Sequence, residues 1–76
     1  MNQRRHGHRF ATHLREEGAH ARQWVANAES FIDAAVQFAE THPVHDEQAS
    51  IVVTDCESGK ERCFLVNFKT GDIQAC

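Results

Sequence analysis

Residues 51–56 read Ile51-Val52-Val53-Thr54-Asp55-Cys56, a short run rich in β-branched side chains. Branching at Cβ restricts the side-chain rotamers and favours the pleated backbone of a strand. A polar turn that contains a glycine follows this run, at Glu57-Ser58-Gly59-Lys60. Because glycine adopts positive φ angles without strain, such a turn typically ends one strand and begins the next. The sequence therefore predicts a strand over about residues 51–56.

Two more strands are predicted downstream. Residues 61–68 place Phe64, Val66 and Phe68 on one face of a strand, and residues 73–76 follow a second glycine-containing turn at 69–72. Two hairpins in succession form a three-stranded antiparallel meander. In this arrangement the side chains of Cys63 and Cys76 point to the same face of the sheet. The spacing leaves open whether they form a disulfide or remain reduced thiols.

The part of the chain before Pro43 has the spacing of an amphipathic helix. Apolar residues recur mostly at steps of three and four, at Phe10, Leu14, Ala21, Trp24, Ala28, Phe31, Ile32, Ala35, Phe38 and Ala39. Proline disfavours helical geometry in the residue before it, so we expect the helix to end at about residue 41. The serine-to-acid spacing of Ser30-Phe31-Ile32-Asp33 matches a capping box, but the apolar pattern continues through it.

The start of this helical region is open to two interpretations. Glu17 interrupts the apolar stripe and Gly18 follows it, and both weaken a continuous helix. The region is either one long helix or two helices, at about residues 8–17 and 19–41. In both cases the predicted fold class is α+β, with helix packed on the meander. We expect residues 1–76 to form a single domain in which residues 1–7 are a mobile basic arm.

The length of the predicted helix suggests a second copy of the chain. An unbroken helix from residue 8 to 41 would be roughly 50 Å long, whereas a strand of eight residues spans only roughly 26 Å. Apolar surface that the sheet does not reach would be exposed to water, which favours a homodimer. The residues expected at the dimer contact are the large apolar ones of the stripe: Trp24, Phe31, Phe38, Phe10 and Leu14.

The charge of the chain is unevenly distributed and suggests a protein partner. Residues 1–24 have a net charge of +3 and residues 25–76 of −6, within an overall −3. We expect a non-enzymatic interaction module, an inhibitor or regulator, that binds a protein through its helix and acidic surface. The residues of this acidic surface, all within residues 25–76, are Glu29, Asp33, Glu40, Asp46, Glu47, Asp55, Glu57, Glu61 and Asp72.

Two alternative functions rest on the N-terminal residues. In a helix, His13, Glu17 and His20 fall at i, i+4 and i+7, and two imidazoles with a carboxylate can bind zinc. This would be a metal-binding or metal-sensing domain, and no other cofactor is expected. Alternatively, Arg4, Arg5 and Arg9 could contact the phosphates of a nucleic acid.

Several protein classes are excluded by what the chain lacks. It contains no glycine-rich phosphate loop, no Cys-x-x-Cys pair and no spacing that supports a catalytic triad, so we do not expect an enzyme. No apolar run of about 18 residues is present, which argues against a membrane span. The polar N-terminus has no hydrophobic core of a signal peptide, and we therefore expect a cytoplasmic protein.

Overall fold

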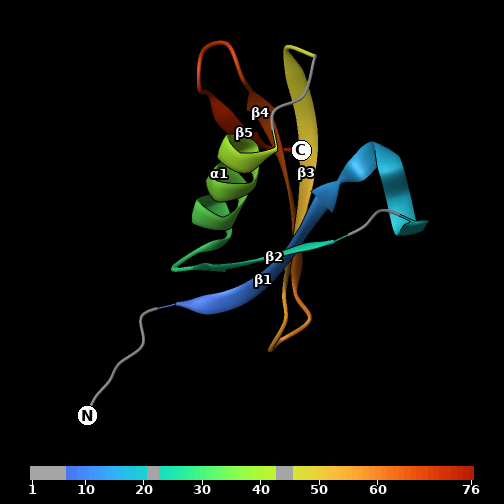
Figure 1. Ribbon diagram of the computed structural model, residues 1–76, viewed down its shortest axis with the longest axis vertical. Helices are drawn as coiled ribbons and strands as arrows, with labels where there is room; N and C mark the ends of the chain where they lie inside the picture. The colour runs from blue at the N-terminus through green and yellow to red at the C-terminus, as the bar shows by residue number, and fades with distance from the viewer. Residues whose placement is uncertain (1–6, 21–22, 43–45) are drawn as a thin grey trace.

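The computed structural model describes residues 7–20, 23–42 and 46–76, without the side chains of residues 19 and 20. A five-stranded antiparallel sheet forms the body of the protein, and one short helix packs on one of its faces (Figure 1). In chain order the elements are β1 (His8–Leu14), the 3₁₀ helix η1 (Arg15–His20), β2 (Trp24–Ala28), α1 (Phe31–Thr41), β3 (Gln48–Asp55), β4 (Glu61–Asn67) and β5 (Ile73–Ala75). The spatial order of the strands is β2-β1-β3-β4-β5.

The predicted fold class, a long helix or two helices packed on a three-stranded meander, was wrong, and the error arose in the N-terminal half. The regions assigned to helices at about 8–17 and 19–41 contain two strands, β1 and β2, and within the described residues α-helix is confined to α1. The error has a simple geometric cause. A spacing of four residues places side chains on one face of a helix, but four is even, so it also places them on one face of a strand. Phe10 and Leu14, like Trp24 and Ala28, satisfy both patterns. The sheet therefore has five strands instead of the predicted three.

The connection between β1 and β2 includes the break at Gly18. Residues 15–20 form η1, and Gly18 interrupts it with φ 65° and ψ −154°, a conformation that side chains with a Cβ rarely adopt. β1 and β2 then pair antiparallel, with Phe10 opposite Ala26 and Thr12 opposite Trp24. The glycine thus marks a change of direction between two strands, and no continuous helix runs through it.

Helix α1 begins at the capping signal that the sequence carries. Ser30 is the N-cap, and its hydroxyl accepts a hydrogen bond from the Asp33 backbone N–H at 3.1 Å. The first helical residue is therefore Phe31, and the apolar pattern that continues N-terminal to it belongs to β2. The helix ends at Thr41, the position that Pro43 predicts. Within the described residues, no helix is long and apolar enough to cross a membrane.

The hydrophobic core lies between α1 and the sheet. Its buried members are Phe10, Ala28, Ala34, Ala35, Phe38, Ile51, Val53, Phe64 and Val66. The residues expected at a dimer contact belong to this core, because Phe10 and Phe38 are 2% and 5% exposed and Leu14, Trp24 and Phe31 pack against them. Helix α1 has only 11 residues. The sheet of the same chain therefore covers the apolar stripe that a long helix would have left exposed.

The three C-terminal strands form consecutive hairpins. Ile51 lies opposite Phe64, and Phe64 lies opposite Ala75. This register brings Cys63 and Cys76 directly across from each other, and they form a disulfide with a Cα–Cα distance of 5.4 Å. Cys56 is a free, exposed thiol. The disulfide ties the end of the short edge strand β5 to β4. Residues 1–6 of the predicted basic arm lie outside the described residues, and the single-domain assignment stays a prediction.

Candidate functional site

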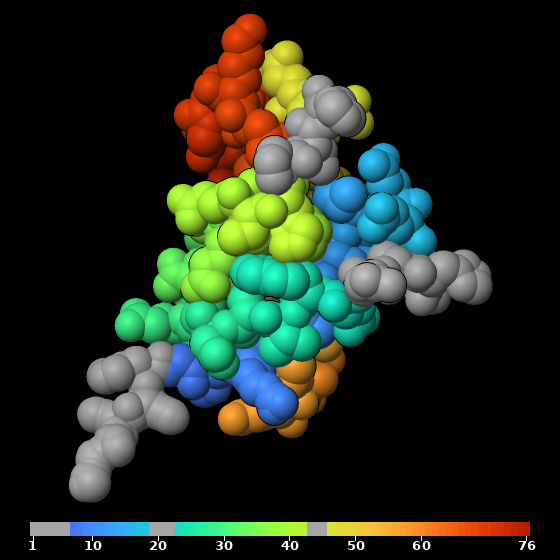
Figure 2. All heavy atoms as spheres, viewed as in Figure 1, coloured from blue at the N-terminus to red at the C-terminus, as the bar shows by residue number. Residues whose placement is uncertain are grey.

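The two faces of the sheet present different surfaces, and a hollow lies on each. Because side chains alternate along a strand, the residues between the core positions point to the face opposite α1. This open face carries Arg9, Ala11, His13, Ser50, Val52, Cys63 and Leu65. Ala11 and Val52 are each only 8% exposed, so their neighbours on the sheet cover them closely. The helical face instead exposes the outer side of α1 and the β4–β5 hairpin (Figure 2).

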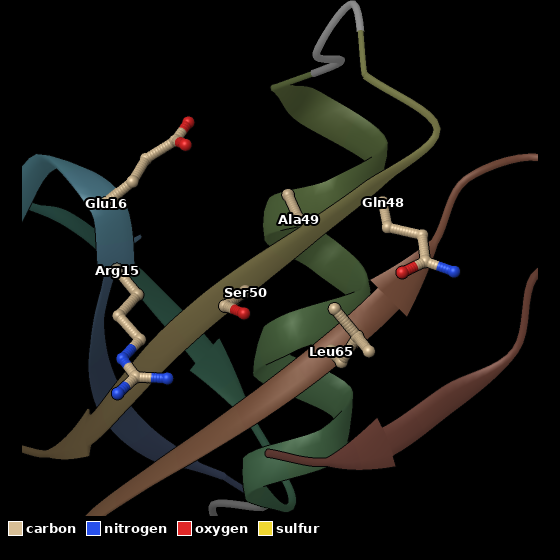
Figure 3. Close-up of a pocket in the computed structure, with 6 residues that line it drawn as sticks. All are labelled: Arg15, Glu16, Gln48, Ala49, Ser50 and Leu65. Carbon is tan, nitrogen blue, oxygen red and sulfur yellow. The ribbon is translucent and has the colours of Figure 1, made fainter.

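The hollow on the open face lies where β1 continues into η1. It has a volume of about 480 Å³ and is lined by Arg15, Glu16, Gln48, Ala49, Ser50 and Leu65. Figure 3 shows the Arg15 side chain lying beside β3 on one side of Ser50, with Leu65 and Gln48 on the other side of the serine. The Glu16 carboxylate points away from the Arg15 guanidinium. One cation, a hydroxyl and an amide thus surround an apolar floor.

His13 lies beside this hollow, on the same face of β1. It is half-buried and pairs in register with Val52. Its Nδ1 atom is buried and has no hydrogen-bond partner within the described part of the chain. Burying a polar atom without a partner costs roughly 1–3 kcal/mol.

The geometry assumed for a zinc site is not present. His13 belongs to strand β1 and Glu17 to η1, so they do not share a helical face with His20, whose side chain lies outside the described atoms. Among the residues that are described, no group of three or more His, Cys, Asp or Glu could hold a metal ion. The zinc site therefore remains a prediction without its helical premise. Of the arginines assigned to nucleic-acid binding, Arg9 is exposed on β1 and Arg4 and Arg5 lie outside the described residues.

The hollow on the helical face lies between α1 and the β4–β5 hairpin. It has a volume of about 380 Å³ and is lined by Val36, Ala39, Glu40, Val66, Asn67, Phe68, Gly71 and Ile73. The lining is mainly apolar, and Val36, Ala39, Phe68 and Ile73 are half-buried. Ile32 precedes Val36 by one helical turn and is 50% exposed. It extends the apolar surface from the hollow along the outer side of α1. We call the surface formed by Ile32 and the residues that line this hollow the helix groove.

Carboxylates surround the helix groove. Glu40 lines it, and Asp72 stands between two lining residues, Gly71 and Ile73. The Phe68 backbone N–H donates a hydrogen bond of 2.8 Å to the Glu47 carbonyl, which fixes Glu47 next to the lining residue Phe68. Asp33 lies one turn before Val36 on the helix. These four acidic residues are exposed, and the turn between β4 and β5 contains one cation, Lys69. The surroundings of the groove therefore have a negative potential.

The hairpin wall of the helix groove is held by local hydrogen bonds. Asn67 Oδ1 accepts bonds from the backbone N–H groups of Lys69 and Thr70, both at 2.9 Å. The Asp72 N–H donates to Thr70 Oγ1 at 3.2 Å, and Gly71 adopts φ 84°. The disulfide fixes the far end of β5. The wall is thus preorganised, which lowers the entropic cost of binding.

Among the described residues, the clear pKa shift belongs to a turn and not to either hollow. Asp55 Oδ1 accepts a hydrogen bond of 2.8 Å from the Glu57 backbone N–H. This bond lowers the pKa of the Asp55 carboxyl, because it favours the charged form. Asp55 is at the β3–β4 turn, where His8 Nδ1 also lies 3.7 Å from the Glu57 carboxylate. The arrangement stabilises the turn and indicates no catalytic role.

Sequence reasoning identified part of the helix groove and none of the open-face hollow. Asp33, Glu40, Glu47 and Asp72 were among the acidic residues predicted to contact a partner. Ile32 and Ala39 were assigned to the apolar stripe of a helix, which was expected to face the meander or a second copy. The open-face hollow was missed because residues 8–14 were assigned to helix. Alternation within His8-Arg9-Phe10-Ala11-Thr12-His13-Leu14 was the signal that could have shown it.

Comparison with known proteins gives a family but no function. The model of a "Family of unknown function (DUF5961)" matches residues 8–76. The chain therefore belongs to this family, and the match includes every strand and the helix. No curated protein and no solved structure matches the chain.

Proposed function

We propose that this member of the DUF5961 family is a non-enzymatic interaction module that binds a protein partner through α1 and the acidic surface around it. The observation that carries the proposal is the helix groove, an apolar hollow of about 380 Å³ with carboxylates on its rim. The partner is a segment with apolar side chains between lysines or arginines. A regulator or inhibitor is the role that fits a module of this size.

The apolar part of the groove supplies the binding free energy. Ile32 is 50% exposed, and covering the rest of such a side chain gains roughly 1 kcal/mol. Val36, Phe68 and Ile73 are half-buried and have further surface to cover. Apolar contacts at the centre of an interface, enclosed by a polar rim, are the arrangement that gives most of the affinity in protein complexes.

The carboxylates supply the selectivity. Asp33, Glu40, Glu47 and Asp72 are exposed, so each ion pair with a partner would add only about 0.2–1 kcal/mol. Their combined field attracts a basic segment and repels an acidic one, which affects association rate and partner choice more than affinity. A basic and apolar segment satisfies both parts of the surface, whereas a nucleic acid would be repelled by the rim.

A partner of a different sequence is more consistent with this surface than a second copy. The homodimer was predicted because the apolar stripe was expected to be exposed. Phe10, Phe38 and their neighbours instead lie in the core of their own chain. The helix groove is rich in carboxylates, and two copies that met at this surface would bring like charges together.

The cellular location remains a prediction. The sequence favours the cytoplasm, but the Cys63–Cys76 disulfide argues for an oxidising compartment, because the cytosol keeps most protein thiols reduced. Alkylation of protein from its native host, followed by intact mass spectrometry, distinguishes the two. A single modified thiol, that of Cys56, indicates the oxidising compartment, and three modified thiols indicate the cytoplasm.

Two synthetic peptides test the proposed function. In one, leucine alternates with lysine, and in the other, leucine alternates with glutamate. Titration of the isotope-labelled protein, followed by amide chemical shifts, should show saturable shifts at Val36, Ala39, Phe68 and Ile73 with the lysine peptide. The glutamate peptide should bind at least tenfold more weakly. Equal binding of both peptides, or shifts confined to the open face, would refute the assignment.

A further inference from the structure

The open-face hollow contains polar side chains that have no partner among the described residues. Within residues 7–20, 23–42 and 46–76, the side chains of Arg15, Gln48 and Ser50 make no hydrogen bond or ion pair. Arg15 is the first residue of η1 and follows Leu14, which pairs with Ile51, and Ser50 precedes Ile51, so Arg15 and Ser50 lie at the same end of the β1–β3 ladder. Ser50 in turn pairs with Leu65. A cation, a hydroxyl and an apolar side chain therefore lie next to one another.

The guanidinium is positioned for an anion. It lines the same hollow as Ser50, and Figure 3 shows it alongside β3, while the neighbouring Glu16 carboxylate points elsewhere. A guanidinium matches a carboxylate because its parallel N–H groups can donate two hydrogen bonds at once. The Ser50 hydroxyl can donate to the same group. Glu16 lines the rim of the hollow and disfavours a second negative charge, which selects a monoanion over a doubly charged phosphate.

The floor of the hollow adds an apolar contact. Leu65 is half-buried and faces the hollow between Ser50 and Gln48 (Figure 3). The volume of about 480 Å³ is within the range of sites for small molecules. We infer that this hollow binds a carboxylate attached to a short apolar group, with the carboxylate on Arg15 and Ser50 and the apolar group on Leu65. This inference concerns the opposite face of the sheet and is independent of the helix groove.

The first experiment separates the charge from the apolar group. Amide chemical shifts of the labelled protein are followed during titration with hexanoate, with hexanamide and with acetate. Hexanoate should give saturable shifts at residues 48–50 and at Leu65. Hexanamide, which lacks the charge, and acetate, which lacks the apolar chain, should each bind at least tenfold more weakly. The inference is overturned if hexanoate gives no saturable shift or if hexanamide binds equally well.

A matched pair of variants assigns the charge to one residue. Arg15→Gln should weaken hexanoate binding at least tenfold. Arg9→Gln is the control, because Arg9 is exposed on the open face of the sheet, which also carries the hollow, but does not line the hollow. It should change the affinity less than twofold. An equal loss in both variants would show attraction to the general charge of the face and would overturn the site.

A further probe identifies the source of the carboxylate. N-acetyl-leucine presents the carboxylate of a peptide C-terminus, whereas hexanoate represents a free acid. Tighter binding of N-acetyl-leucine supports the site as a receptor for chain ends, and tighter binding of hexanoate supports it as a small-molecule site. Failure of both probes would overturn the inference and leave the helix groove unaffected, because the two sites are tested by different ligands and different shifts.

Discussion

The Thr12 hydroxyl donates a hydrogen bond of 2.7 Å to the backbone carbonyl of Trp24 and so joins the middle of β1 to the start of β2. Thr12 is fully buried, at 0% exposure, and is the one polar residue among the buried side chains of the described chain. A buried polar group is tolerated when it has a partner. This bond therefore links the two strands that the sequence pattern had assigned to helix.

Replacement of this hydroxyl should destabilise the protein. Thr12→Val keeps the side-chain volume but places an apolar methyl against the Trp24 carbonyl. We expect the free energy of unfolding to fall by about 1–2 kcal/mol, as measured by urea denaturation. Thr54→Val is the control, since Thr54 is half-buried on the open face and should change stability by less than about 0.5 kcal/mol. Equal effects would mean that the bond contributes nothing specific.

The N-cap of α1 allows a second prediction. Ser30→Ala removes the acceptor of the Asp33 N–H bond and should lower the free energy of unfolding by about 1 kcal/mol. Ser30→Asp retains an acceptor and places a negative charge at the positive end of the helix dipole, so it should preserve stability. Thermal unfolding followed by circular dichroism measures both. A neutral Ser30→Ala variant would contradict the assigned start of the helix.

The disulfide should stabilise the fold through β5. Reduction, or replacement of Cys63 and Cys76 by serine, should lower the free energy of unfolding by about 2–4 kcal/mol. Strand β5 packs against the core cluster through Ile73. When the disulfide no longer holds this strand, amide exchange should accelerate first at residues 73–75. Cys56→Ser is the control, because that thiol is free and exposed. Unchanged exchange in β5 after reduction would show that the disulfide does not hold this strand.

Asp55 gives a prediction for pH dependence. Its pKa is lowered in the folded protein by the Glu57 N–H bond, so its charged form stabilises the turn. The contribution is present above the pKa of the unfolded chain and is lost as the pH falls through the lowered folded pKa. Asp55→Asn removes the titration. The stability difference between wild type and variant should therefore shrink on acidification, as measured by urea denaturation across acid pH. A difference independent of pH would contradict this account.

The strands of the C-terminal third were predictable because their signals are local. Strands predicted at 51–56, 61–68 and 73–76 are found at Gln48–Asp55, Glu61–Asn67 and Ile73–Ala75. Two glycines with positive φ, Gly59 and Gly71, mark the turns between them. Here β-branched residues, alternation and turn residues all indicate the same structure, and tertiary contacts had nothing to override.

The N-terminal half was not predictable from spacing alone. Its apolar residues fit periods of both two and 3.6, and alanine-rich composition favoured the helix. The decisive local signal was the capping box at Ser30, which marked the start of α1 and implied another structure before it. Even with that signal, the pairing of β1 with both β2 and β3 depends on long-range contacts, and no short pattern encodes them.

The same limits explain which parts of the candidate sites could be predicted. The acidic character of the surface proposed to bind a partner is visible in the sequence, because the carboxylates of residues 25–76, among them Asp33, Glu40 and Asp72, outnumber the lysines and arginines. The helix groove itself arises where α1 meets the β4–β5 hairpin, residues that are far apart in the chain. Arg15, Ser50 and Leu65 come together only through the register of three strands, which the sequence does not specify.

The exposed isoleucine on α1 provides the most direct test of the proposed binding surface. Ile32 is 50% exposed within the helix groove, and Val25 is 54% exposed on the other side of the sheet. Ile32→Ser and Val25→Ser therefore remove similar apolar surface from opposite faces, and the affinity of each variant for the leucine–lysine peptide can be measured by calorimetry. We predict at least a fivefold loss of affinity for Ile32→Ser and less than a twofold change for Val25→Ser. Equal affinities, or a larger loss in Val25→Ser, would contradict binding at the helix groove.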